Sequence, residues 1–157
     1  MDINKLIDDS KKVRISILNT ISSLSAAQLN EIPAGFNNNI IWNIAHIVAS
    51  QQGLTYFRSG LEMPVGDDYF KKYKSETKPE EPVSEGEIEK IKEFILSSID
   101  QFKKDYSEAL FSNFQSFTSR YGIEFNNIEE VIPFVTFHDG IHFGYVMALK
   151  RVISKNI

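Results

Sequence analysis

The sequence contains no cysteine among its 157 residues. This absence excludes disulfide bonds, a cysteine nucleophile and thiolate ligands for a metal ion. It is compatible with a reducing compartment, and we expect the protein to be cytoplasmic. The first residues, Met1-Asp2-Ile3-Asn4-Lys5, lead into a charged amphipathic run, so no signal peptide is expected.

Long apolar runs and basic patches are absent as well. A membrane-spanning helix needs about 20 consecutive apolar residues, and the sequence has no such stretch. The formal net charge is −4, and the lysines are interspersed with acidic residues. We therefore expect neither a membrane nor a nucleic acid as partner. A small-molecule substrate is the expected partner, and the chain could also form a homodimer.

Motifs of several enzyme classes are missing too. The sequence has no glycine-rich phosphate loop, no serine-triad motif and no Glu-x-x-His pair for a carboxylate-bridged two-metal site. Its apolar content of 42% and charged content of 24% are those of an ordinary globular protein. We expect residues 1–157 to form a single domain with its own hydrophobic core.

Four segments show the apolar periodicity of long helices, with apolar residues recurring every three or four positions. Their expected bounds are residues 3–24, 40–59, 84–110 and 127–154. Ser84 and Glu87 form a capping-box pattern at the start of the third segment, and Gly60 would end the second. Residues 111–125 are expected to be an irregular connection rich in aromatic residues.

Residues 61–83 are the longest irregular stretch, with a short helix expected at residues 67–74. A connection of this length in a small bundle is usually a crossover or a lid over a site. Its aromatic residues Tyr69, Phe70 and Tyr73 could line a pocket or anchor the loop. The predicted fold is therefore all-α: a four-helix bundle with a long crossover connection between helices 2 and 3.

The three histidines of the chain all fall on predicted inward faces of long helices. His138 and His142 are four residues apart, so on a helix they lie one above the other and can reach one metal ion. His46 lies in the second helix, which is apolar on most sides and is therefore expected to be central. Because bundles build metal sites from inward side chains on facing helices, we expect the three histidines to form one site.

The alternative is that these histidines are buried hydrogen-bonding groups without a ligand. Each buried ring nitrogen would then need a partner, which is harder to provide for two neighbouring imidazoles. Ala49 and Gly53 follow His46 on the same face and could leave room for an ion, or let another helix approach. Asp139 falls off the predicted apolar stripe. It could orient a ligand histidine, act as a base, or be an exposed carboxylate.

Two blocks of the sequence resemble the DinB/YfiT-like family of metalloenzymes. The first block is Leu29-Asn30-Glu31-Ile32-Pro33 followed by Trp42 and His46. The second runs from Gly122 through His138-Asp139-Gly140-Ile141-His142-Phe143-Gly144 to Arg151. The resemblance implies a four-helix bundle that holds a divalent metal ion on His46, His138 and His142. One departure is Phe143, where relatives often carry a polar residue, commonly Arg.

The expected site has a definite chemistry. Three neutral imidazoles leave one coordination position open and suit Zn²⁺ or Ni²⁺. Family members with known activities include thiol S-transferases and thiol-dependent isomerases, so the resemblance implies a low-molecular-weight thiol as cofactor. With no cysteine in the chain, that thiol would come from outside. Trp42 and Tyr145, with aromatic residues of the crossover, could wall the pocket.

The predicted function is therefore a metal-dependent transferase that activates a small thiol on a three-histidine site. One alternative is a metal-dependent hydrolase that uses water at the same site. Another is a bundle that binds a metal ion or a ligand without catalysis. Thiol dependence would separate the first two activities.

Overall fold

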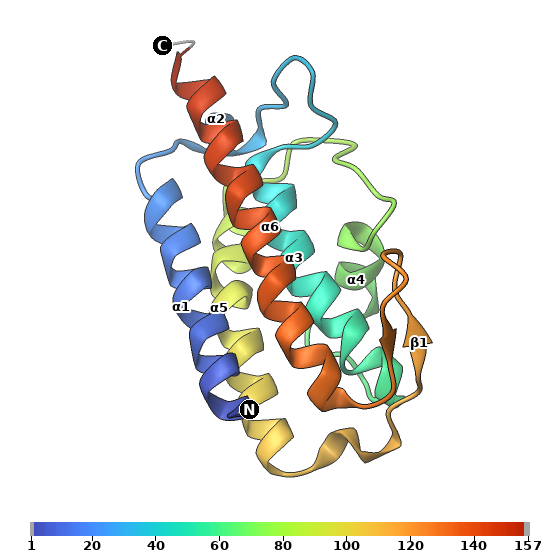
Figure 1. Cartoon of the computed structure of the whole chain (residues 1–157). Helices are drawn as coiled ribbons and strands as arrows, with labels where there is room; N and C mark the ends of the chain where they lie inside the picture. Colours follow the sequence, from blue (N-terminus) through green and yellow to red (C-terminus); the bar gives the residue numbers. More distant parts are fainter. Residues whose placement is uncertain (1, 156–157) are drawn as a thin grey trace.

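Apolar residues spaced three or four positions apart fold into helices over most of the chain. Within residues 2–155, which the computed structural model describes, four long helices form the core. Figure 1 labels them α1 (Ile3–Ile21), α3 (Ile40–Leu54), α5 (Glu85–Ser107) and α6 (Ile128–Lys155). Shorter helices lie between them, α2 (Ala26–Asn30) and α4 (Asp67–Tyr73). The predicted all-α fold class is confirmed.

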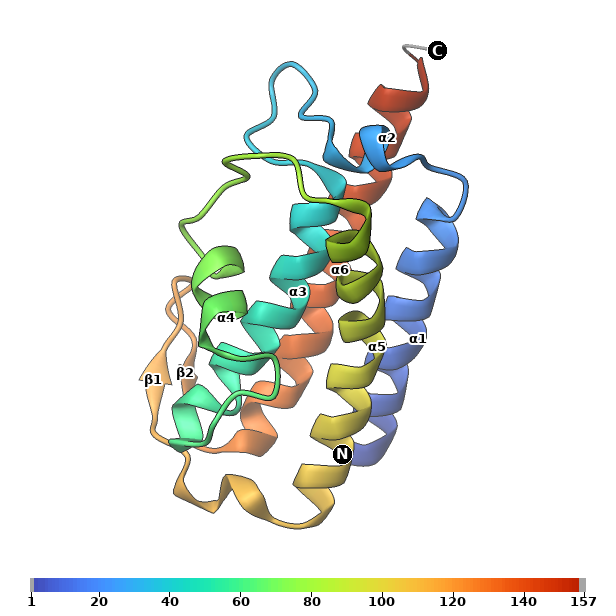
Figure 2. The ribbon, with the colours of Figure 1, turned by 180° about the vertical axis from the view of Figure 1, so that it is seen from behind.

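The long helices pack side by side, and α1 and α3 each lie against both α5 and α6. The colours in Figures 1 and 2 show that the chain rises in α1 and α6 and descends in α3 and α5. Because α3 and α5 run in the same direction, their connection must return along the length of the molecule. That connection contains α4, which packs against α3. The long crossover predicted from the sequence is therefore present.

Side-chain caps fix where the helices begin. Asn39 accepts a hydrogen bond from the backbone N–H of Trp42 at 2.8 Å, which starts α3. Ser84 accepts one from the backbone N–H of Glu87 at 3.2 Å, which starts α5. The capping box predicted there is only half formed, because the Glu87 carboxylate instead accepts from the Tyr73 hydroxyl at 2.6 Å. Glu87 thus ties α5 to the end of α4.

Several predicted boundaries are wrong. The second helix ends at Leu54 rather than at residue 59, and a 3₁₀ turn, η1 (Phe57–Ser59), follows it. The Tyr56 hydroxyl donates to Asp105 of α5 at 2.6 Å, which holds this turn against α5. Gly60, which was predicted to end the second helix, instead ends this 3₁₀ turn, with φ of 68°.

The connection between α5 and α6 is not wholly irregular. It contains a 3₁₀ turn, η2 (Leu110–Asn113), and an antiparallel hairpin of β1 (Phe117–Thr118) and β2 (Glu124–Phe125). Strands of two residues are too short to produce an alternating apolar pattern, so the sequence gives no signal for them. Figures 1 and 2 both show this hairpin on the same side of the molecule as α4.

Each long helix contributes a fully buried apolar residue to the core, among them Ile17, Ile44, Ile91 and Leu149. On α6 the buried residues include Val135, Asp139, Val146, Leu149 and Ile153. The prediction that Asp139 falls off the stripe is therefore wrong.

None of the helices in the described part of the chain combines the length and the apolar character that crossing a bilayer requires.

A buried ion pair explains why a carboxylate can lie on the inward stripe. Arg14 of α1 donates to Asp139 through Nε at 2.8 Å and through Nη2 at 3.4 Å. Its Nη1 donates to Gln51 of α3 at 3.2 Å and to Ser98 of α5 at 3.1 Å. The guanidinium offsets the cost of burying the carboxylate, and its fork of donors reaches all the other long helices.

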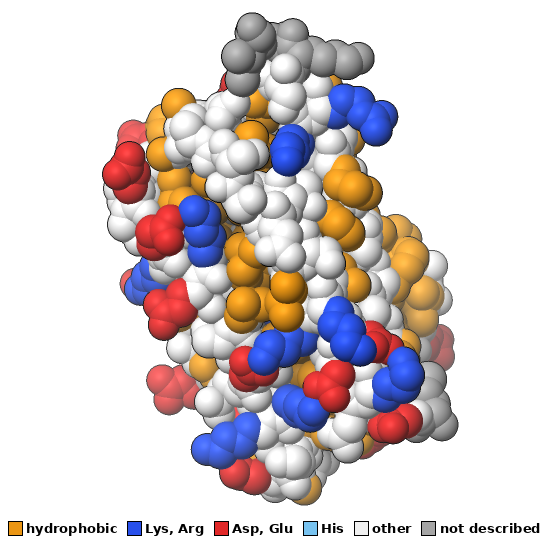
Figure 3. Space-filling model, turned by 90° about the vertical axis from the view of Figure 1, so that its left-hand side faces the viewer, with side chains coloured by type: hydrophobic (Ala, Val, Ile, Leu, Met, Phe, Trp, Pro, Cys, Tyr) orange, Lys and Arg blue, Asp and Glu red, His pale blue; other side chains and the backbone are white. Residues whose placement is uncertain are grey.

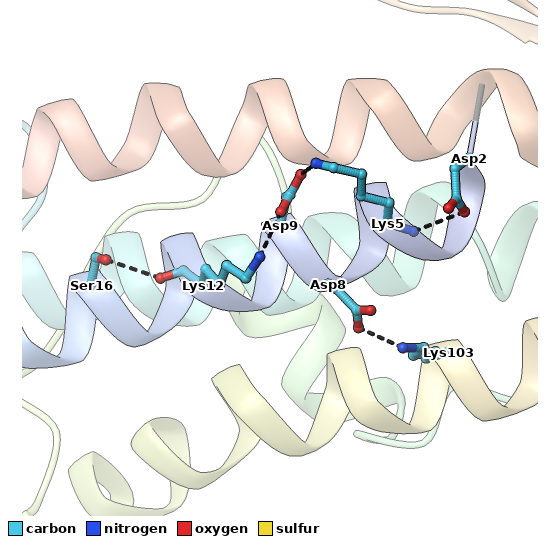
Figure 4. Close-up of polar contacts among 7 residues, drawn as sticks. All are labelled: Asp2, Lys5, Asp8, Asp9, Lys12, Ser16 and Lys103. Carbon is cyan, nitrogen blue, oxygen red and sulfur yellow. Dashed lines mark hydrogen bonds and ion pairs between the residues drawn. The ribbon is translucent and has the colours of Figure 1, made fainter.

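The outer face of α1 carries exposed ion pairs instead, as Figure 4 shows. Lys12 pairs with Asp9 at 3.0 Å, and Lys103 of α5 pairs with Asp8 at 2.6 Å. Acidic and basic side chains are mixed over this face (Figure 3). Exposed pairs of this kind typically contribute about 0–1 kcal/mol each, so apolar burial accounts for most of the packing energy.

Candidate metal centre

The structure brings together the three histidines that the sequence predicts as ligands. His46 comes from α3, and His138 and His142 come from successive turns of α6. Their ring centroids are 4.5 to 5.3 Å apart. One ring nitrogen of each lies within 4.8 Å of the other two, and the group could hold a metal ion.

His46 is buried, and the crossover holds its ring in place. Its Nδ1 is 2.6 Å from the carbonyl oxygen of Tyr73, the last residue of α4. Nδ1 must therefore carry the proton and donate it, which leaves the lone pair on Nε2. Ser50 donates its hydroxyl to that Nε2 at 3.1 Å. The indole of Trp42 stacks on the imidazole, with ring centroids 4.7 Å apart.

His142 is held in the same way by a side chain of α3. Its Nδ1 donates to the amide oxygen of Asn43 at 2.8 Å. The Asn43 amide nitrogen donates to the Asn39 carbonyl at 2.7 Å and to the Asn38 side chain at 3.0 Å. These bonds fix the orientation of the amide, so Nε2 of His142 is left as the acceptor. Metal-binding histidines commonly donate their second ring N–H to an oxygen in this manner.

The electrostatic surroundings keep all three rings neutral. Burial lowers the pKa of His46 below its ordinary value. Burial, together with the neighbouring His142 and His46, lowers the pKa of His138 to about 2. The pKa of His142 falls to about 3, mainly through burial and then through His46. A neutral imidazole is the form that binds a metal ion, so the donor set is ready near neutral pH.

The histidines line one side of a pocket of about 550 Å³. Aromatic and aliphatic side chains make up much of its wall, including Trp42, Leu54, Phe57, Phe70 and Phe134. Polar residues that follow α4, and others from the hairpin, complete the lining, among them Lys74, Ser75, Glu76 and Arg120. The pocket therefore joins a candidate metal centre to a chamber with both apolar and polar walls.

Comparison with known families agrees with this geometry. The sequence model of the DinB superfamily matches residues 11–146, a span that contains all three histidines. The chain belongs to the DinB superfamily. No curated protein matches it in sequence. The superfamily is in general metal-binding, and in this DinB protein the three-histidine group is where an ion could be held.

Asp139 does not have the position that a base or a ligand-orienting residue needs. Its side chain is fully buried and is paired with Arg14 rather than with a histidine. It does not line the pocket of this DinB protein. Asn43 and the Tyr73 carbonyl orient the imidazoles instead. The prediction of a functional role for Asp139 at the site is therefore corrected.

Two predictions about the pocket wall have different outcomes. Trp42 lines the pocket and stacks on His46. Tyr145 does not line it; its ring packs edge-on against Phe36, with ring centroids 5.6 Å apart. Phe143, the departure from the family pattern, packs against the hydrophobic core, so no charge comes from that position.

Gly53 lines the pocket and also allows close packing of α4 on α3. A Cβ atom at this position would lie 2.8 Å from the ring of Phe70. The glycine thus lets α4 approach α3, and this approach brings the Tyr73 carbonyl to His46. The sequence left both interpretations open, and the structure gives Gly53 a part in each.

Sequence reasoning missed several residues that shape the site. Asn43 lies one turn before His46 in a helix that is otherwise largely apolar, and an isolated amide there was a usable signal. Arg14 lies three residues before the buried Ile17, so its place on the inward face of α1 could have been found from periodicity. Arg120 lies in a short hairpin, and nothing local in the sequence indicates its contact with the pocket.

Proposed function

We propose that His46, His138 and His142 hold one divalent ion, and that this DinB protein is a metal-dependent transferase for a small thiol. The convergence of three neutral imidazoles on one side of a pocket carries the proposal. When bound, the ion would lower the pKa of a thiol at its open position, so that the thiol reacts as a thiolate near neutral pH.

The donor set supports a first-row ion. The candidate group contains imidazole nitrogens and no carboxylate. Nitrogen ligands suit Zn²⁺ or Ni²⁺, whereas Mg²⁺ and Ca²⁺ prefer oxygen. Oxygen atoms of the Tyr73 backbone and the Asn43 side chain accept from Nδ1 of His46 and of His142, which leaves Nε2 of each ring as the nitrogen able to bind an ion.

The surrounding residues favour a thiol over water as nucleophile. Hydrolysis is usually assisted by a general base that accepts a proton from water. Among the described residues that line the pocket, Glu76 is the one carboxylate, and it is exposed. A thiol is much more acidic than water and needs no such base. Because the chain has no cysteine, the thiol would be a separate small molecule.

The protein residues would position the reactants and limit the access of water. The aromatic wall, including Trp42 and Phe134, offers contact area to an apolar electrophile. Transfer to an aryl halide would form a carbon–sulfur bond and release halide and a proton. Transfer to an epoxide would form the same bond and leave a hydroxyl on the adjacent carbon. Both reactions balance without an oxidant.

The test begins with metal analysis of the purified protein. The protein loaded with Zn²⁺ or Ni²⁺ is then incubated with 1-chloro-2,4-dinitrobenzene and a panel of small thiols. We expect at least one thiol to react faster than with the His46→Ala variant, which removes one ligand. If no thiol does so while simple esters are hydrolysed, a hydrolase replaces this proposal. If neither reaction occurs although the ion binds, the protein is a metal-binding bundle without this activity.

A further inference from the structure

The pocket differs in charge from the rest of the molecule. The formal net charge of the chain is −4, and positive and negative side chains are mixed on the face shown in Figure 3. The charged residues in the pocket lining, apart from the histidines, are Arg58, Lys74, Arg120 and Glu76. Three positive charges against one negative charge make this pocket a local positive region in an acidic protein.

Arg120 presents its guanidinium at the pocket from the turn of the hairpin. Its Nη2 donates to Ser75 of the segment that follows α4, at 2.8 Å. In the part of the chain that the structure describes, no carboxylate lies within ion-pair distance of Arg120. A guanidinium has five N–H donors, so several of them are free for a ligand. Burial is the main cause of the lowered pKa of His142, and the positive charge of Arg120 also contributes to it.

Arg58 provides a second guanidinium from the turn after α3. Its Cζ lies 4.3 Å from the centre of the Phe117 ring, and this stacking fixes its plane. Arg58 is half-buried, and within residues 2–155 it forms no ion pair with a carboxylate. A partly buried, stacked and unpaired guanidinium has a high electrostatic attraction for an anion.

Apolar side chains make up much of the remaining wall. Phe57 and Phe70 stack with ring centroids 6.0 Å apart, and both line the pocket together with Leu54 and Phe134. A volume of about 550 Å³ lies within the range of pockets that enclose small organic ligands. The pocket therefore combines three kinds of lining: imidazoles, an apolar wall and two unpaired guanidinium groups.

We infer that this pocket selects small molecules that combine an apolar, aryl-sized body with an anionic group, and that Arg120 and Arg58 bind the anionic group. A carboxylate matches the planar fork of a guanidinium, and a phosphate can be bound in the same way. The inference rests on the proposed function only in taking the histidines as the reacting side of the pocket. It assigns specificity to side chains outside the three-histidine group.

Ligand binding to the metal-free protein tests this inference. The probes are phenylacetate and phenylacetamide, which have the same body and differ in charge. Trp42 is the one tryptophan of the chain and lines the pocket, so its fluorescence reports binding. We expect phenylacetate to bind at least about tenfold more tightly than phenylacetamide. Phenyl phosphate, as a third probe, distinguishes phosphate from carboxylate as the preferred group.

Substitutions then assign the preference to residues. Arg120→Gln is expected to weaken phenylacetate binding about tenfold and to leave phenylacetamide binding unchanged. Arg151→Gln removes an exposed arginine that is not in the pocket lining, and it should change neither. Ser75→Ala keeps the charge of Arg120 but removes its anchor, so a smaller loss is expected. If the circular dichroism spectrum shows that Arg120→Gln disturbs the fold, Arg58→Gln provides a second test.

Equal binding of the two probes by the wild type would overturn the inference. The inference would also be overturned if the Arg120→Gln variant and the Arg58→Gln variant both kept the preference for phenylacetate. Because these measurements use metal-free protein, a failure of metal binding leaves their outcome intact. Conversely, the protein could bind its ion and conjugate thiols but show no preference for phenylacetate over phenylacetamide. The proposed function would then stand, and this inference would not.

Discussion

The hydrogen bond from His142 to Asn43 decides which nitrogen of the imidazole faces the other histidines. Replacing Asn43 by alanine removes the acceptor and lets the ring change tautomer or rotate. We expect Asn43→Ala to lower the affinity for Zn²⁺ about 10- to 100-fold, as is typical when the partner of a ligand histidine is lost. Calorimetric titration measures this effect.

Asn38→Ala is the matched control for that prediction. It removes one hydrogen-bond partner of the Asn43 amide nitrogen but keeps the oxygen that accepts from His142, so the affinity for Zn²⁺ should stay within a few-fold of the wild type. An Asn43→Ala protein that is folded and binds Zn²⁺ as tightly as the wild type would show that the amide does not orient a ligand.

The buried histidines also predict how the metal-free protein responds to acid. The folded-state pKa of His138 is about 2 and that of His142 is about 3, whereas an unfolded histidine has a pKa of about 6.5. Between these values the unfolded chain binds more protons than the folded one, so stability falls as pH drops below about 6.5. The loss can reach about 1.4 kcal/mol per pH unit for each such histidine.

Urea denaturation at pH 7.5 and at pH 5, in the presence of a chelator, checks the acid response. A variant with both His138→Gln and His142→Gln should show a shallower dependence over the same range. If the wild type and the double variant lose stability equally, the acid sensitivity comes from other groups.

The three ligand candidates could be predicted from the sequence because spacing and helical phase are local properties. His138 and His142 are four residues apart, and His46 lies in the most apolar helix. Their hydrogen-bond partners could not be predicted in the same way. The Tyr73 carbonyl reaches His46 across 27 positions of the chain, and only the packing of α4 on α3 brings the two together.

Arg14 and Asp139 show how one buried pair fixes the relation between the long helices. The pair joins α1 to α6, and the remaining donors of Arg14 reach α3 and α5. Asp139→Ala would leave a buried guanidinium without its counter-charge. We expect a loss of about 3–5 kcal/mol in the free energy of unfolding, measured by urea denaturation.

An exposed ion pair between two of the long helices provides the comparison with the buried pair. Lys11 of α1 pairs with Asp100 of α5 at 2.6 Å, and both side chains are partly exposed. Asp100→Ala should therefore cost only about 0–1 kcal/mol. Replacing Arg14 and Asp139 together by leucine should recover much of the stability lost in Asp139→Ala. Equal losses for Asp139→Ala and Asp100→Ala would contradict the buried-pair account.

Sequence periodicity predicts helices better than it predicts their ends. The start of α3 was predictable because Asn39 is a strong cap. Its end at Leu54 was not, because the turn that follows is held by a contact between Tyr56 and Asp105, two residues far apart in the sequence. The inward stripe of α6 was misjudged for a related reason. Asp139 looks like a surface residue until its partner Arg14 is known.

At the scale of the whole molecule, the pocket is formed by segments that leave the core of long helices. Because α3 and α5 run in the same direction, the crossover passes over α3 and delivers α4 to His46. The hairpin between α5 and α6 adds Arg120, which is bonded to Ser75 of the crossover. The histidines therefore lie on rigid helices, while the groups inferred to select the substrate lie on connections, where sequence can vary without loss of the core.

This separation predicts how the ion affects the stability of the whole protein. Apolar burial on α1, α3, α5 and α6 holds the fold, so removal of the ion by a chelator should leave the helical circular dichroism nearly unchanged. An ion at 100 times its dissociation constant adds about 2.7 kcal/mol to the stability. For a chain of 157 residues, we expect this addition to raise the melting temperature by roughly 5–10 °C. The His142→Ala variant, measured with and without Zn²⁺, should show little or none of that rise. Loss of the helical signal on chelation would instead make the ion part of the folding core, as in a structural zinc site.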